Sequence, residues 1–246
     1  MNRYTYDLHM HSALSPCADD DMTPNNMAGF AALAGLAIAA LTDHNTAANC
    51  PAFFEACKRY GVVPVGGMEL TTAEEIHIVC LFPTLDAVME FDRLVGPRRM
   101  KIKNDPSVFG EQLIFDAEDQ VIGSDPYYLP AATDIPLEEV PILVKRCGGI
   151  CYPAHIDRSS GGLPAILGGF PPEVPFTCYE LNDEANKEIY LERFPVLKGL
   201  RQICCSDAHR LDSIKDAANS LLLEDEPYSS ALLRISLIKK LANPTI

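Results

Sequence analysis

The sequence has 246 residues, of which 48% are hydrophobic, and its formal net charge is −14. This length allows one domain with a sizeable core, and the charge excludes a long basic track for nucleic acid. The apolar runs are too short to span a bilayer, and residues 1–7 lack the apolar segment of a secretory signal. We therefore expect one domain over residues 1–246 of a cytoplasmic protein, with no membrane partner and no stable nucleic-acid partner.

The nine cysteines are odd in number and lie mostly in strand-like apolar runs, which favours reduced core thiols over disulfides. No pair has the C-x-x-C spacing of a structural zinc site.

Strand-like and helix-like runs alternate along almost the whole chain, which is typical of β/α units with parallel strands. We expect strands at residues 4–8, 38–41, 62–65, 77–81, 150–152, 178–181, 202–205 and 220–223. Helices are expected at residues 24–36, 51–60, 85–95, 136–146, 183–193 and 229–241. The pattern predicts an α/β fold with seven or eight β/α repeats.

One region, residues 96–133, breaks this alternation. It contains strand-like runs at residues 111–116 and 120–123 joined by a polar turn, which predicts a β-hairpin insertion within the single domain. Residues 161–175 are rich in glycine and proline, and we expect them to form a loop near the active face.

All six histidines lie in short motifs close to predicted strands. His9 and His11 are two residues apart, so their side chains project from the same side of a strand. The other motifs are Thr42-Asp43-His44, Gly66-Gly67-Met68-Glu69, His77 alone, Pro153-Ala154-His155 and Ser206-Asp207-Ala208-His209. A single histidine at a strand end is usually structural, but this joint pattern predicts a metal site, because imidazole and carboxylate suit Zn, Mn and Fe.

The ordered set of motifs between Asp7 and His209 resembles the polymerase and histidinol phosphatase (PHP) family of metal-dependent phosphoesterases. The resemblance implies a distorted (β/α)7 barrel with a β-hairpin insertion and a site for two or three divalent ions. In its short length and its insertion at residues 96–133, the chain is similar to the family branch that contains small nucleoside-monophosphate phosphatases and 5′ exonucleases.

The resemblance also implies a set of ligands for a trinuclear site. One ion would be held by His9, His11, Glu69 and Asp207, a second by Glu69, His77 and His155, and a third by His44, His209 and an aspartate of the first loop. Counting back from Thr23-Pro24 selects Asp19 as that aspartate. The loop is longer than in the family branch, so Asp20 and Asp21 stay open as alternatives.

These ligands predict the chemistry. Divalent ions about 4 Å apart lower the pKa of a bridging water, and the resulting hydroxide attacks a phosphate ester. We expect Glu69, Asp207 and His209 to be catalytic, and Arg158 and Ser159 to bind the substrate phosphate. The predicted substrate is a small phosphomonoester, a nucleotide or an oligonucleotide end.

Asp43, Arg158 and one basic cluster each allow two interpretations. Asp43 either orients a ligand or caps a helix, and Arg158 either grips phosphate or forms a surface ion pair. The one basic cluster is either solvated or a contact for a nucleotide backbone, and it consists of Arg98, Arg99, Lys101 and Lys103.

Two other function classes remain in competition. An amidohydrolase barrel also begins with H-x-H, but it usually supplies a carboxylated lysine from a middle strand, and no lysine follows a predicted strand here. A non-catalytic metal-binding protein would keep the ligands and lack turnover.

Overall fold

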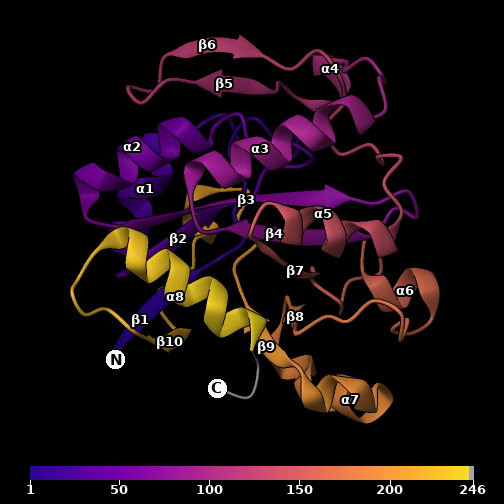
Figure 1. Ribbon diagram of the computed structural model, residues 1–246. Helices are drawn as coiled ribbons and strands as arrows, with labels where there is room; N and C mark the ends of the chain where they lie inside the picture. Colours follow the sequence, from indigo (N-terminus) through magenta and orange to yellow (C-terminus); the bar gives the residue numbers. More distant parts are fainter. Residues whose placement is uncertain (244–246) are drawn as a thin grey trace.

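The computed structural model describes residues 1–243 and has a mixed α/β fold. Its main sheet has six strands in the order β10-β1-β2-β3-β4-β7, and it curls around one end of the molecule (Figure 1). The strands are β1 (Asn2–Asp7), β2 (Ile38–Leu41), β3 (Val63–Thr71), β4 (His77–Phe82), β7 (Ile150–Pro153) and β10 (Ser220–Leu223). A separate parallel pair, β8 (Cys178–Leu181) and β9 (Arg201–Cys204), lies next to β7.

The strand directions differ in part from the parallel repeats that the alternation predicts. Strands β1, β2 and β3 are parallel, but β4 is antiparallel to both β3 and β7, and β10 is antiparallel to β1. The reason lies in β3, which extends to Thr71, well beyond the predicted end at residue 65, and is buried along its whole length. A short turn then returns the chain as β4 without an intervening helix.

The six predicted helices occur in the predicted order, and two short helices, at residues 106–109 and 163–167, were not predicted. The helices are α1 (Pro24–Leu33), α2 (Cys50–Tyr60), α3 (Leu85–Val95), α4 (Pro106–Phe109), α5 (Val140–Arg146), α6 (Leu163–Leu167), α7 (Lys187–Arg193) and α8 (Ser230–Ala242). The Thr23 side chain accepts a hydrogen bond from the backbone of Asn26 and so caps α1, as its place before Pro24 indicates. The segment 161–175 is not only loop, because α6 begins within it at the buried Leu163.

The β-hairpin lies where the sequence predicts one. Strands β5 (Leu113–Phe115) and β6 (Val121–Ser124) pair antiparallel and lie above α2 and α3 in Figure 1, apart from the main sheet. The side chain of Asn49 attaches the hairpin to the start of α2, because it donates to the Leu113 carbonyl at 3.0 Å and accepts from the Phe115 amide at 2.9 Å.

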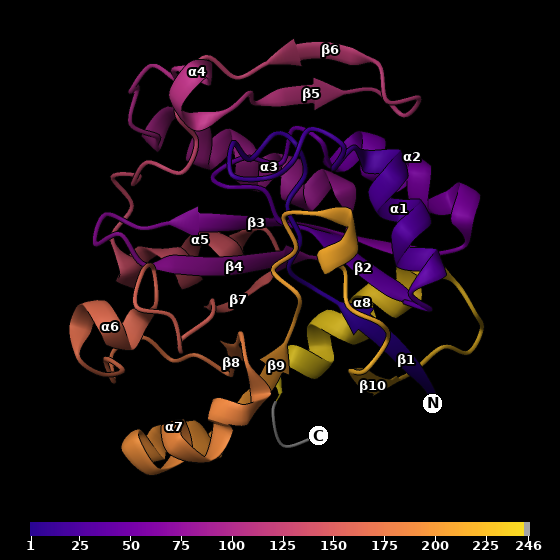
Figure 2. The ribbon, with the colours of Figure 1, turned by 180° about the vertical axis from the view of Figure 1, so that it is seen from behind.

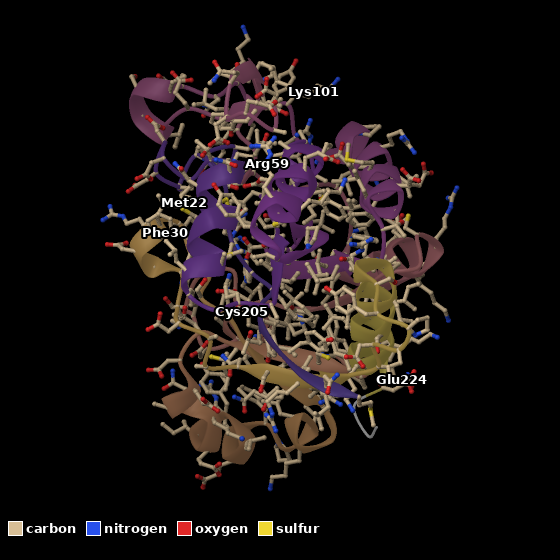
Figure 3. The ribbon with its side chains drawn as sticks, turned by 90° about the vertical axis from the view of Figure 1, so that its left-hand side faces the viewer. Met22, Phe30, Arg59, Lys101, Cys205 and Glu224 are labelled. Carbon is tan, nitrogen blue, oxygen red and sulfur yellow. The ribbon has the colours of Figure 1, made fainter. Side chains whose placement is uncertain are left out.

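The core has two main parts, one on each face of the sheet. One part packs α1, α2, α3 and α5 against the sheet around Met27, Phe53 and Phe91. The other lies inside the curl, where α8 packs through Leu237 onto Val65 and Tyr152. All nine cysteines are free thiols. Figure 3 places Cys205, one of the buried ones, in the interior, and shows Lys101 and Glu224 toward opposite ends of the molecule.

Within residues 1–243, no helix combines the length and apolar character that crossing a membrane requires.

Candidate metal centre

The first histidine pair follows β1 directly and lies deep in the protein. His9 and His11 are completely buried. The chain between them is held on both sides, because Met10 forms a parallel bridge with Ala208 and its carbonyl accepts from the Thr42 amide at 2.9 Å. Figure 2 shows the segment after β9 crossing beside the ends of β2 and β3, which brings the last motif to the first two.

Glu69 lies at the centre of the histidine cluster. It is 1% exposed and lies within β3, next to strands that carry other members of the cluster. Its carboxylate oxygens contact five imidazole rings, with N–O distances of 3.5 Å to His9, 3.2 Å to His11, 3.0 Å to His44, 2.9 Å to His77 and 3.0 Å to His155. One carboxylate therefore joins five histidines that come from four separate motifs of the sequence.

Asp207 is the second carboxylate of the cluster, and its side chain is 1% exposed. Its Oδ1 atom lies 3.4 Å from His9 Nε2 and 3.2 Å from His11 Nε2. His209 completes this side, with its Nδ1 atom 3.7 Å from the same oxygen. All six histidines are thus gathered around Glu69 and Asp207.

The histidine nitrogens also face one another. The Nε2 atoms of His9 and His11 are 3.1 Å apart, which leaves room for only one proton between them. The rings of His11 and His209 stack with centroids 4.4 Å apart. Metal ions or protons must lie among these lone pairs and carboxylates to stabilise the arrangement.

The pKa values of the clustered side chains favour the protonation states that bind metal ions. Burial raises the pKa of Glu69, but the charges of His77 and His9 outweigh that effect and hold the pKa of Glu69 well below the usual value. Burial lowers the pKa of His44 to about 4 and that of His209 to about 3, so both rings are neutral at physiological pH. Neutral imidazole and ionised carboxylate are the forms that bind metal.

His11 is different from these two rings. Burial lowers its pKa, but the interactions of its ring N–H with the carboxylates of Asp207 and Glu69 outweigh that effect and raise the pKa to about 9. A cation that binds here must therefore displace a proton.

The residues present fit divalent metal ions. Three groups have ligand atoms within 4.8 Å of one another: His9 with His11 and Glu69, His44 with Glu69 and His77, and His11 with His44 and His209. Among residues 1–243, the Nδ1 atom of His155 and both carboxylate oxygens of Asp207 are buried without a hydrogen-bond partner of good geometry. His44 lies close to Glu69 as well as to His209, so it borders more than the single ion that the resemblance assigns to it.

Glu180 is a member of the site that the sequence motifs did not reveal. It is fully buried in β8, and both of its oxygens accept from His9 Nδ1, at 2.9 and 3.0 Å. The signal was a lone carboxylate in the apolar run Cys178–Leu181, since a buried carboxylate requires a partner.

Asp43 orients the first loop and does not cap a helix. It accepts from the Ser12 amide at 2.8 Å, from Ser12 Oγ at 2.6 Å and from Ser15 Oγ at 2.7 Å. The Ser15 hydroxyl in turn lies 3.2 Å from His11 Nδ1. The N-cap of the following helix is Asn49.

Two of the candidate ligands have unusual backbone conformations. His155 has φ of 24° and Asp207 has φ of 49°, a region that costs most residues about 1–3 kcal/mol. Gly161 packs against the cluster from the outside, because a Cβ atom there would lie 2.8 Å from the His77 ring. The backbone conformations at His155, Asp207 and Gly161 thus allow these residues to lie close to the cluster.

The two predicted phosphate-binding residues lie at different places. Arg158 pairs with Asp207 at 2.5 Å and donates to Asn182 Oδ1 at 2.9 Å, so it adjoins the metal cluster. Ser159 is exposed and lines a cleft beside His77.

Asp19 lies near the cluster, but its side chain does not enter it. Its backbone amide donates to the His209 carbonyl at 2.9 Å, while its half-exposed carboxylate faces Arg210 at 3.5 Å. Asp20 and Asp21 are exposed as well.

The basic cluster is largely neutralised within the protein. Arg98 pairs with Asp134 and Glu139, and Arg99 pairs with Asp125. These ion pairs neutralise the two arginines of the cluster, whereas Lys101 and Lys103 are exposed.

Solved structures of similar fold come from several proteins. The lesion-specific endonuclease PfuEndoQ from Pyrococcus furiosus is 17% identical with a TM-score of 0.63, and the match covers 91% of this chain and 53% of that one. The chain thus spans about half the length of that endonuclease. A protein assigned as a metal-dependent phosphoesterase from Bifidobacterium adolescentis is 20% identical with a TM-score of 0.54, covering 83% of this chain and 87% of that one.

A third similar structure is an amidohydrolase from Chromobacterium violaceum with bound sulfate. It is 17% identical with a TM-score of 0.55, covering 89% of this chain and 92% of that one. At these identities the likenesses establish the fold. No curated protein matches the chain.

The family model described as the PHP domain matches residues 7–124, a segment that contains His9, His11, His44, Glu69 and His77. His155 and His209 join the four histidines of this segment around Glu69 and Asp207. Nearly half of the chain, residues 7–124, thus matches the PHP family.

Proposed function

We propose that this protein is a metal-dependent phosphoesterase that hydrolyses a small phosphomonoester or a terminal nucleotide. The observation that carries the proposal is the position of Glu69, a fully buried carboxylate within 3.5 Å of five imidazole rings. Only cations satisfy so many lone pairs around one carboxylate, and a cluster of cations is also what attracts an anionic ester to an acidic protein.

The ligands in this proposal are the six histidines together with Glu69 and Asp207, and they would hold two or three ions of Zn, Mn or Fe. When bound, the ions supply an activated water and neutralise the charge of the phosphoryl oxygens. Asp19 completes a trinuclear site if its side chain turns from Arg210 toward His209, to which its backbone is already bonded.

Other residues would act on the substrate. Arg158 lies beside Asp207 at the edge of the cluster, where its guanidinium can bind a phosphate in a bidentate manner. Ser159 offers a hydroxyl from the adjoining loop. His209 has 26% of its side chain exposed, so its ring would be accessible to a bound substrate and could take part in catalysis.

The finer architecture is part of the same proposal. The curled sheet, continued by β8 and β9, would form the distorted (β/α)7 barrel of one domain, with the β5–β6 hairpin as an insertion.

The amidohydrolase alternative is weaker. One similar structure bears that name, but in this chain the central bridging position belongs to Glu69, where an amidohydrolase would usually have a carboxylated lysine.

The test is hydrolysis of a chromogenic aryl phosphate by the metal-stripped protein after addition of Mn, Zn or Fe. We expect phosphate release that depends on the metal and is abolished by Glu69→Gln and by Asp207→Asn, while Glu188→Gln on the exposed face of α7 changes nothing. Bound ions without turnover on any ester would indicate a non-catalytic metal protein, and turnover of cyclic amides alone would indicate an amidohydrolase.

A further inference from the structure

A second cleft, of about 460 Å³, lies away from the metal cluster, between α2, the first residues of β3 and the first turns of α8. This volume is within the range of small-molecule sites, about 300–1,000 Å³. Pro64 of β3 lines the cleft, and Glu69 lies roughly 17 Å farther along the same strand, at about 3.3 Å per residue. A small ligand in this cleft is therefore out of reach of the metal cluster.

Arg234 of α8 lines this cleft and is held in a fixed orientation. Its Nε atom donates to the Pro83 carbonyl at 2.9 Å, and its Cζ atom lies 5.4 Å from the centre of the Phe54 ring. Phe54 is 6% exposed, so this ring is a rigid support for the guanidinium. These contacts use one N–H group and one face of the guanidinium. Among residues 1–243, the two terminal nitrogens have no hydrogen-bond partner.

No carboxylate in the described part of the chain neutralises Arg234. Burial lowers the pKa of its guanidinium, and no neighbouring negative charge counteracts that effect. Lys58 and Glu55 also line the cleft, but they pair with each other at 2.5 Å. The three charged side chains therefore leave one unpaired positive charge, in a protein whose formal net charge is −14. A half-buried cation without a counter-charge is costly, and a single negative charge would compensate it.

The rest of the lining is largely apolar. Val62 and Pro64 are buried and Leu85 is partly exposed, so together they offer an apolar wall. Tyr228, which is 66% exposed, adds an aromatic ring that can cover a flat ligand. A phosphate group carries up to two negative charges at neutral pH and is a poorer match than a carboxylate for one unpaired cation.

We propose that this cleft is a second ligand site, which binds an aromatic monocarboxylate. The carboxylate pairs with the two terminal nitrogens of Arg234, whose planar fork matches a carboxylate in a bidentate manner. The aromatic part of the ligand packs between Tyr228 and the apolar wall. This site requires neither bound metal nor hydrolysis.

The first test is isothermal titration of the protein with 2-naphthoate and with its neutral counterpart 2-naphthamide. We expect saturable binding of one naphthoate, and binding of the amide that is about tenfold weaker or more, because only the carboxylate forms charge-assisted hydrogen bonds with a guanidinium. The folded Glu69→Gln variant, which is altered in the metal cluster, should bind naphthoate as the wild type does. Equal binding of the two probes, or loss of naphthoate binding in Glu69→Gln, would overturn the proposal.

The second test compares substitutions inside and outside the cleft. Arg234→Gln should weaken naphthoate binding by about tenfold or more. Arg193→Gln is the matched control, because Arg193 also lies over a phenylalanine ring, that of Phe194 at 5.0 Å, but does not line the cleft. Tyr228→Ala alters an exposed side chain and should weaken binding by about threefold.

Urea denaturation of each variant establishes that it is folded before its affinity is compared. Wild-type affinity in folded Arg234→Gln or in folded Tyr228→Ala would contradict the proposal, as would an equal loss in Arg193→Gln. Because the readout is binding, a protein that releases no phosphate from any ester would overturn the proposed function and leave this second site standing.

Discussion

Glu180 binds the Nδ1 atom of His9 with both carboxylate oxygens, at 2.9 and 3.0 Å. Because a carboxylate only accepts, His9 carries a proton on Nδ1, and its Nε2 atom, which faces Glu69 and Asp207, is the nitrogen that can bind a metal ion once it is deprotonated. Glu180, in the buried strand β8, thus determines which ring nitrogen of His9 can bind a metal ion.

Replacing Glu180 by Gln should weaken metal binding without removing a ligand. The amide cannot fix the His9 tautomer in the same way, and losses of such orienting partners lower metal affinity by about 10–100-fold. Isothermal titration of the metal-stripped protein with Zn or Mn measures the effect. Glu188→Gln on exposed α7 is the control, and equal affinities for the two variants would show that Glu180 does not orient His9.

Gly161→Ala should disturb His77 specifically. The added Cβ would lie 2.8 Å from the His77 ring, and a misplacement of about 1 Å at a reaction centre can reduce activity by about a hundredfold. Gly168→Ala is a matched control, since both glycines have positive φ, 69° and 77°, but nothing lies within 4 Å of a Cβ at Gly168.

Both glycine variants should lose similar stability from their backbone strain, about 1–2 kcal/mol. Only Gly161→Ala should lose metal-dependent turnover at equal folded fraction, as measured by aryl phosphate hydrolysis beside urea denaturation. If the two variants keep the same kcat, the contact between Gly161 and His77 does not matter for the site.

Metal binding should depend on pH in a defined direction. His11 in the metal-free protein has a pKa of about 9, so at lower pH the free protein carries a proton that the loaded protein lacks. The pKa of His9 is raised as well, because the charges of Glu180, Asp207 and Glu69 outweigh the effect of its burial, so metal binding displaces a proton there too. Affinity should therefore rise by about tenfold or more per pH unit up to pH 9. Titrations in buffers of different ionisation enthalpy should report the released proton, and an affinity that is constant between about pH 6 and pH 9 would contradict the assignment.

The sequence predicted those parts of the fold that depend on local pattern. The bounds of β2 and α3 agree with the expected ones, because a short apolar run and an amphipathic run with the N-cap Thr84 define them. Glu69 was misplaced, since Gly66-Gly67 looked like the end of a strand. The strand in fact continues, and Gly67 is required by close packing, because a Cβ there would lie 2.7 Å from Thr42 Cγ2.

Long-range contacts of the site had no local signal. Glu180 reaches His9 across 171 residues of sequence, and Arg158 meets Asp207 from a different loop. The histidine motifs did predict that the histidines converge with Glu69 and Asp207, because each motif lies near an end of a predicted strand. The carboxylate of Asp19 could not be placed by counting, since its direction depends on the competing ion pair with Arg210.

Asn45 links the metal cluster to the cleft beside His77, one wall of which is the loop 128–133, and its removal should destabilise both. Its side chain donates to Leu129 and Ala131 and accepts from the Thr71 amide at 2.8 Å, and its φ of 52° suits asparagine or glycine. Asn45→Ala leaves these buried groups unpaired at about 1–3 kcal/mol each, and it adds left-handed strain. Asn45→Gly removes the same hydrogen bonds without that strain.

Urea denaturation should therefore rank the free energy of unfolding as wild type, then Asn45→Gly, then Asn45→Ala, with a gap of about 1 kcal/mol between the two variants. Both variants should also raise KM for a nucleoside monophosphate more than they lower kcat, because the cleft wall loosens while the ligands of the ions remain. A glycine variant as stable as the wild type and with unchanged KM would mean that loop 128–133 is held by its backbone contacts to Thr71 alone, since the Thr133 amide and hydroxyl both donate to that carbonyl.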